Sequence, residues 1–136
     1  MSSISAIAVS GLNAASRRLQ VSASNVANSQ TTGALPNADG TVPAGAPTAY
    51  SPLALVQTAS AGGGVQTSIT TITPSTTAVF DPQASFANQD GLVAAPNVDL
   101  AQEFVGQLLA SYSFAANAAV LRADDHMTKS LIDITA

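Results

Sequence analysis

The sequence contains no cysteine, few charged residues and few aromatic residues. Without cysteine, neither a disulfide framework nor a thiolate metal site can form. Four residues are basic and eight are acidic, which gives a net charge of −4. A nucleic-acid partner would require a basic face, so the charge predicts that this chain has no such partner.

Long apolar runs are also missing. No stretch of about 18 uninterrupted apolar residues occurs, so we expect no membrane-spanning helix. Residues 1–12 lack the Lys/Arg-bearing start of a secretory signal peptide, so export would need another route. The terminal segments carry too little Lys and Arg for a helix that lies on a membrane surface. Together these absences predict no membrane insertion.

Proline is absent from both ends of the chain, because all seven prolines lie between Pro36 and Pro96. Residues 97–136 instead show apolar residues at helical spacing, which predicts a long amphipathic helix. Such a helix would extend about 50–60 Å, more than a compact domain of this size needs. Its main stripe consists of Val105, Leu108, Leu109, Tyr112, Ala116, Ala119, Val120, Ala123, Met127, Leu131 and Ile134. A second stripe consists of Leu100, Phe104, Phe114, Ala118, Leu121 and Ile132.

Residues 3–29 form a second predicted helix with two apolar seams. Leu12, Leu19 and Val26 are seven residues apart, and a different flank carries Ile7, Ala14 and Val21. Two seams on one helix indicate packing against more than one partner helix. A helix buried in a globular core is the alternative, but too little sequence remains to bury it. Much of the apolar content is alanine, which buries little surface, so the chain is expected to need neighbouring subunits.

The two seams predict two sets of contacts. Within one subunit, we expect Leu12, Leu19 and Val26 to pack against the main stripe of the long helix, at Val105, Leu108, Tyr112, Val120 and Met127. Neighbouring subunits are expected to contact Ile7, Val21, Phe104, Phe114 and Leu121. Because isolated helices of this composition are marginal in water, both helices are predicted to be partly disordered until assembly.

The segment between the helices differs sharply in composition, with every proline, most of the glycines and no Lys or Arg. Residues 53–58 and 65–73 have strand character, and residues 78–80 could form a third short strand. Gly62–Gly64 and Asp39–Gly40 are expected turns. The predicted fold class is therefore mainly α with a small β-rich insert (α+β), in which the terminal helices pair as an antiparallel coiled coil. Residues 1–30 and 97–136 would form a discontinuous helical domain, and residues 31–96 a linker with the β insert.

Asparagines stand at several informative positions. Asn97 and Asp99 can each accept hydrogen bonds from the unpaired first amides of the long helix. Asn25, Asn28 and Asn117 are candidates to fix the register by pairing amides inside the packed layer. Solvent exposure or capping near a helix end is an equally open interpretation of these three residues.

Catalytic and metal-binding patterns are weak. His126 is the only histidine and stands beside Asp124 and Asp125, which would point to different faces of a helix, so a solvated face is favoured over a metal site. Asp125 and Lys129 have the spacing of a helical ion pair. The triple glycine lacks the Lys-Ser/Thr and the helix of a phosphate-binding loop. No serine has a partner base, so we expect no catalytic residue, no cofactor, no metal and no enzyme activity.

Motifs at both ends of the chain resemble those of bacterial flagellar rod and hook proteins. The N-terminal motif runs over residues 10–14, 18–19 and 23–28, with the sequences SGLNA, RL and ASNVAN. The C-terminal motif runs over residues 96–99, 103–105 and 110–117, with the sequences PNVD, EFV and ASYSFAAN. Residues 80–82 and 87–93 are similar to the lead-in of a short proximal-rod member, and the length also suits that member. Tyr112 and Phe114 stand where the family usually has Arg and Tyr, and Ala84-Ser85 replaces a common His-Pro.

The resemblance implies a structural subunit of the proximal rod that assembles homo- and hetero-oligomerically. The implied partners are other proximal and distal rod subunits, the hook–basal body adaptor protein and the flagellar type III export apparatus. It also implies a periplasmic location, export without a cleaved signal peptide, and a role in transmitting torque through a helical tube. Asn97 and Val98 belong to the matching motif and are counted among the expected assembly residues. The alternatives are another short rod subunit, or a divergent secreted or adaptor protein that uses the same two helices for docking.

Overall fold

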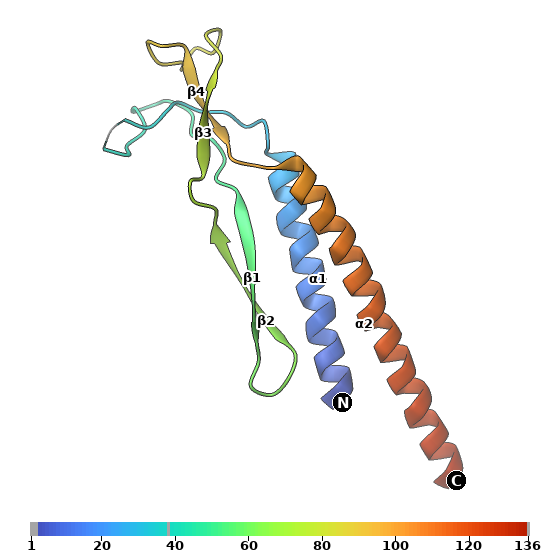
Figure 1. Cartoon of the computed structure of the whole chain (residues 1–136). Coiled ribbons are helices and arrows are strands. Elements are labelled where there is room, and N and C mark those ends of the chain that lie inside the picture. The colour runs from blue at the N-terminus through green and yellow to red at the C-terminus, as the bar shows by residue number, and fades with distance from the viewer. Residues whose placement is uncertain (1–2, 38, 136) are drawn as a thin grey trace.

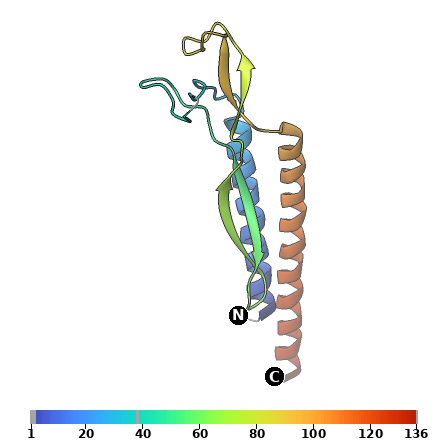
Figure 2. The same ribbon diagram turned by 60° about the vertical axis from the view of Figure 1, so that its left-hand side comes forward.

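The structure is a computed structural model that describes residues 3–37 and 39–135. Helices α1 and α2 lie side by side and antiparallel, and the β strands lie beside α1 and beyond one end of the helix pair (Figures 1 and 2). The predicted α+β class with paired terminal helices is confirmed. The elements are α1 (Ser3–Ala27), β1 (Leu53–Ala59), β2 (Val65–Thr71), β3 (Thr76–Phe80), β4 (Leu92–Pro96) and α2 (Leu100–Thr135). Positions 1, 2 and 136 of the predicted helical domain lie outside the described residues.

The ends of the helices are capped by local hydrogen bonds. Asp99 Oδ1 accepts the backbone N–H groups of Ala101 (2.9 Å) and Gln102 (3.1 Å), as its predicted role as a cap requires. At the end of α1, Asn28 Nδ2 donates to the carbonyl of Ser24 at 2.9 Å. The Asp99 bonds satisfy amides that α2 itself leaves unpaired, whereas the Ser24 carbonyl also accepts the Asn28 backbone N–H at 3.1 Å.

Asn97 does not cap α2, so that part of the prediction was wrong. Its Nδ2 atom donates to the carbonyl of Pro74 at 3.0 Å, and its backbone N–H donates to the carbonyl of Ser75 at 2.9 Å. The side chain is therefore used to hold the start of α2 against the segment that enters β3.

Strands β1 and β2 form an antiparallel hairpin that runs along α1. Leu53 pairs with Thr71 at its open end and Ala59 with Val65 next to the turn. The predicted Gly62–Gly64 turn is confirmed, with the N–H of Gly63 bonded to the carbonyl of Ser60 at 2.9 Å. The hairpin is attached to α1 at both ends, because Ser10 Oγ accepts the Val65 N–H at 3.1 Å and Asn25 holds Leu53.

The spacing of these two attachments matches the length of the hairpin. Ser10 and Asn25 are fifteen residues apart on α1, a rise of about 22 Å at 1.5 Å per residue. The strand from Leu53 to Ala59 advances about 20 Å at 3.4 Å per residue. The hairpin therefore lies parallel to the helix without a bend.

Strands β3 and β4 form a second antiparallel pair beyond the end of the helices, with Phe80 opposite Leu92. Strand β4 was not predicted from the sequence, although its Val93 and Ala94 are among the most buried residues of the described chain, at 0% and 1% exposure. A bridge between Gly33 and Ala94 ties the segment after α1 to this sheet. That close approach requires glycine, because a Cβ on Gly33 would overlap the backbone of Thr48 and Ala49.

Candidate assembly surface

The contact between α1 and α2 is built from small and polar residues at seven-residue spacing. On α1 this inner seam contains Ala8, Gly11, Ala15, Arg18, Ser22 and Asn25, and on α2 it contains Glu103, Ala110, Asn117 and Asp124. Small side chains let two helices approach closely but remove little apolar surface from water. The pairing of the helices within one chain therefore gains little hydrophobic stabilisation.

Hydrogen bonds across the inner seam compensate in part. Ser22 Oγ donates to the carbonyl of Glu103 at 3.1 Å and accepts Gln107 Nε2 at 3.1 Å. At the other end, Ser5 Oγ donates to the carboxylate of Asp124, which is buried. We expected Asp124 on a solvated helix face, and its burial against α1 corrects that expectation.

The predicted hydrophobic seam within the subunit is not formed. Leu19 is 46% exposed, so the large side chains proposed for α1 do not close over α2. The proposed partners on α2 are more than two-fifths exposed in each case: Val105, Leu108, Tyr112, Val120 and Met127. The actual seam is shifted by one residue on α1, from Leu12, Leu19 and Val26 to Gly11, Arg18 and Asn25, and Leu12 and Val26 are only half-buried.

The large apolar residues of α2 instead form an exposed outer stripe, defined here as Val105, Leu108, Leu109, Tyr112, Val120 and Met127. At about 100° per residue, Leu108 and Tyr112 lie on the side of α2 opposite Ala110. Tyr112 is 66% exposed. A contiguous apolar surface of this kind is typical of a face that another chain or an apolar phase covers.

The residues expected to meet neighbouring subunits divide into two groups. Phe104 and Phe114 are exposed at 58% and 46%, Ile7 is 43% exposed, and Leu121 is half-buried, so all four remain open to a neighbour. Val21 is buried within the chain, so its predicted contact with a neighbour is wrong. Val98 is half-buried in the link between β4 and α2.

Asn25 is the most connected side chain in the structure, but it does not pair with another asparagine. Its Oδ1 atom accepts the Leu53 N–H (2.9 Å) and the Tyr50 hydroxyl (3.0 Å). Its Nδ2 atom donates to the Leu53 carbonyl (2.8 Å) and to Glu103 Oε1 (2.6 Å). Asn25 thus joins α1, α2 and the hairpin, a role that the sequence analysis missed because Tyr50 and Glu103 are remote in sequence.

The other two asparagines behave as local caps or packing residues. Asn28 bonds the end of α1, which agrees with the alternative interpretation of a cap. Asn117 Nδ2 donates to the carbonyl of Ser113 at 2.8 Å, and its side chain packs against Gly11. A Cβ on Gly11 would overlap the Asn117 amide, so the glycine leaves the space that this side chain occupies between the helices.

Charged groups on α2 form one ion pair in the part of the chain that the structure describes. Lys129 Nζ lies 2.7 Å from Asp125 Oδ2, which confirms the predicted helical pair. No group of three His, Cys, Asp or Glu residues that could hold a metal ion occurs within residues 3–37 and 39–135.

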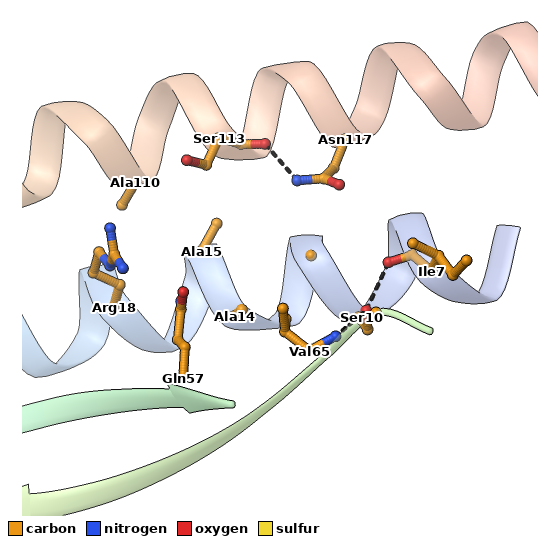
Figure 3. Close-up of a pocket in the computed structure, with 12 residues that line it drawn as sticks. Ile7, Ser10, Ala14, Ala15, Arg18, Gln57, Val65, Ala110, Ser113 and Asn117 are labelled. Atoms are coloured by element: carbon orange, nitrogen blue, oxygen red, sulfur yellow. Dashed lines mark hydrogen bonds between the residues drawn. The ribbon is translucent and has the colours of Figure 1, made fainter. Parts of the chain in front are cut away.

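A cavity of about 250 Å³ lies between α1, α2 and the hairpin (Figure 3). Figure 3 shows Arg18 extending from α1 toward Ala110 of α2, and Gln57 extending from β1 toward α1. Ser113 and Asn117 line the same cavity from α2. The cavity therefore combines a guanidinium with neutral polar groups between three elements.

By length and composition, the Leu100–Ile134 span of α2 is also able to cross a membrane, which differs from our expectation that no helix qualifies. Polar residues such as Gln107 and Ser111 interrupt this span, so it contains no continuous apolar run. A helix of this length and composition can be covered either by lipid or by the apolar faces of other subunits.

Comparisons with known proteins agree with this two-helix arrangement. Residues 6–34, which include most of α1, match the family "Flagella basal body rod protein". Residues 89–134, which include β4 and nearly all of α2, match "Flagellar basal body rod FlgEFG protein C-terminal". The chain therefore belongs to the flagellar basal body rod proteins, a family of structural proteins.

Within this family the chain is similar to the flagellar basal-body rod protein FlgC of Yersinia enterocolitica. The two are 37% identical over 130 residues, which cover 93% of this chain and 88% of the relative. The similarity thus includes the middle segment as well as the two terminal motifs.

Proposed function

We propose that this chain is a structural subunit of the proximal rod that assembles through its terminal helices into a helical tube and transmits torque. The observation that carries this proposal is the exposed outer stripe of α2. Covering each large side chain of this stripe contributes roughly 1.5–3 kcal/mol before entropy is subtracted. Because the inner seam consists of small and polar residues, this hydrophobic stabilisation can be gained only by contacts between chains.

The proposed domain division follows from the same surfaces. Residues 1–30 and 97–136 would form the inner helical layer of the tube, and residues 31–96 would lie outside it. The contacts of this layer would involve Phe104, Phe114 and the outer stripe. Neighbours would be other proximal and distal rod subunits and the hook–basal body adaptor protein.

Other subunits, rather than lipid, are proposed to cover α2. The face of α2 that carries Glu103 and Asp124 is occupied by polar contacts to α1 through Asn25 and Ser5. A membrane-spanning α2 would have to carry α1, with Arg17 and Arg18, into the bilayer or break these contacts. We also propose that the chain reaches the periplasm through the type III export apparatus.

The test replaces Phe104 with Asp in a strain that depends on this subunit for swimming. Because Phe104 is exposed on the face proposed to contact a neighbour, Phe104→Asp should leave the monomer soluble but block incorporation into basal bodies and stop motility. Ala44→Asp adds the same charge in an exposed loop and should incorporate normally. Normal motility with Phe104→Asp, or recovery of the wild-type chain from membranes rather than from basal bodies, would contradict the proposal.

A further inference from the structure

Arg18 has an environment that the packing of a single chain does not explain. Its side chain is half-buried and lines both the cavity of Figure 3 and a second cavity between α1, the hairpin and the start of α2. Within residues 3–37 and 39–135, no hydrogen bond or ion pair reaches its guanidinium. A guanidinium carries five N–H donors that match a carboxylate in a two-bond arrangement, so this site lacks its natural acceptor.

The acidic side chain that also lines the second cavity is held by Asn25 through one carboxylate oxygen. Glu103 Oε1 accepts Asn25 Nδ2 at 2.6 Å, and no ion pair joins Glu103 to Arg18 among the described residues. The other polar side chains around the cavity of Figure 3, those of Ser10, Gln57, Ser113 and Asn117, are neutral. The missing acceptor is therefore expected from outside the chain.

The charge distribution indicates where such an acceptor lies. Helix α1 carries Arg17 and Arg18 and no acidic residue, whereas residues 30–96 carry Asp39, Asp81 and Asp90 and no Lys or Arg. The connection between β3 and β4 lies beyond the far end of the helix pair, so its carboxylates cannot reach Arg18 of the same chain (Figures 1 and 2). A second copy of the chain can supply one of them to this positive site.

Among these three aspartates, Asp90 is the one whose carboxylate is unengaged. Thr41 donates two hydrogen bonds to Asp39, which lower the pKa of that carboxyl. Asp81 Oδ1 accepts the Gln83 N–H at 3.3 Å. The Asp90 side chain is exposed in the turn before β4, and no hydrogen bond or ion pair reaches its carboxylate in the described part of the chain.

We propose that the Arg18 cavity is a docking site for the Asp90 carboxylate of a second copy of this chain. The contact would join the β3–β4 turn of one subunit to the space between the helices and the hairpin of the next. This inference rests on the proposed function and names one specific contact of the assembly. It would fix the position of one copy relative to its neighbour, because a two-bond pair between Arg and Asp is strongly directional.

The absence of natural cysteine makes this contact measurable in assembled rods. Gln57→Cys places a thiol in the cavity, and Gln89→Cys places one beside Asp90, while Arg18 and Asp90 remain intact. In basal bodies oxidised in place, the double variant should form a dimer-sized disulfide product of this chain. Adding Arg18→Gln or Asp90→Asn should reduce that product at least tenfold. The pair of Gln57→Cys with Ala44→Cys, in a different loop, should give no product.

A charge exchange provides the second measurement. Arg18→Asp and Asp90→Arg should each impair swimming, and the two together should restore it, because the exchanged pair keeps opposite charges in contact. Arg17→Gln removes the same charge from the adjacent exposed position and should leave swimming unchanged. The isolated Arg18→Gln subunit should melt at the wild-type temperature, since Arg18 has no acceptor within the chain.

The possible failures are distinguishable. If the wild-type chain does not purify with basal bodies, the proposed function itself fails. Three results would overturn only the Asp90 contact in a chain that does purify with basal bodies. The first is that no dimer product forms, and the second is that the cysteine at position 57 couples to a different rod protein. The third is that rods with Arg18→Gln assemble normally. A lowered melting temperature of the isolated Arg18→Gln subunit would also overturn the Asp90 contact, by showing an acceptor within the chain.

Discussion

The side-chain amide of Asn25 is bonded to both backbone groups of Leu53, as a neighbouring strand would be. Its Oδ1 accepts the Leu53 N–H at 2.9 Å, and its Nδ2 donates to the Leu53 carbonyl at 2.8 Å. With Tyr50 and Glu103 as further partners, Asn25 uses both of its donors and both acceptor positions. At 1% exposure, this side chain is the point where helix packing and hairpin position are joined.

Removing that amide should release the open end of the hairpin. We expect Asn25→Ala to lower the free energy of unfolding by about 2–4 kcal/mol, because several buried polar groups lose their partner at once. Hydrogen exchange should accelerate at the amides of β1 more than in the middle of α1. Asn28→Ala is the matched control, since the Asn28 side chain bonds only to the nearby Ser24 carbonyl and Thr31 hydroxyl at the helix end, and it should cost about 1 kcal/mol or less. Equal losses for the two variants would show that Asn25 has no special role.

The sequence was sufficient to predict both helices, the first hairpin and the cap at Asp99, because each depends on local spacing and turn chemistry. The packing seam was predicted at the wrong position, because the most apolar side of each helix does not face the other helix of the same chain. Here Leu108 and Tyr112 face away, while Ala110 and Asn117 face α1. The spacing of apolar residues thus indicates which side of a helix must be covered. It does not indicate whether the same chain or a neighbouring chain covers that side.

Strand β4 and the Asn25 contacts were not predictable for a different reason. The run of residues 92–96 is short, rich in alanine and closed by a proline, so it carries little strand signal by itself. Its burial depends on the bridge from Ala94 to Gly33, some sixty residues earlier in the chain. Long-range contacts of this kind have no periodic signature in a single sequence.

Two helical glycines should respond in opposite directions to the same substitution. Gly11→Ala places a methyl group in the Asn117 amide, whereas Gly106→Ala places one in open space. Replacing a helical glycine by alanine gains about 0.5–1 kcal/mol, and overpacking costs about 1–3 kcal/mol. We therefore expect Gly106→Ala to raise the free energy of unfolding by about 0.5–1 kcal/mol and Gly11→Ala to lower it by about 0.5–2 kcal/mol, both measured by urea denaturation.

A second substitution, at Asn117, tests whether the clash with this side chain causes the loss of stability in Gly11→Ala. Asn117→Ala shortens the opposing side chain, so the double variant Gly11→Ala/Asn117→Ala should recover most of the stability that Gly11→Ala loses. If the Gly11→Ala variant were as stable as the Gly106→Ala variant, the helices would not approach closely at Asn117.

The turn of the first hairpin offers a matched pair of glycines that tests whether its tip rests on α1. Gly64 has a φ of +82°, and a Cβ there would overlap Ser10 Oγ, whereas a Cβ on Gly62 would meet no atom within 4 Å. The left-handed backbone alone costs an alanine about 1–2 kcal/mol, and displacing Ser10 adds the loss of its bond to Val65. Gly64→Ala should therefore lower the free energy of unfolding by about 2–3 kcal/mol and speed exchange of the Val65 amide, while Gly62→Ala should change either by little. A Val65 amide that exchanges rapidly even in the wild-type chain would show that the hairpin tip is free of α1, and the proposed alignment of the hairpin along the helix would then be wrong.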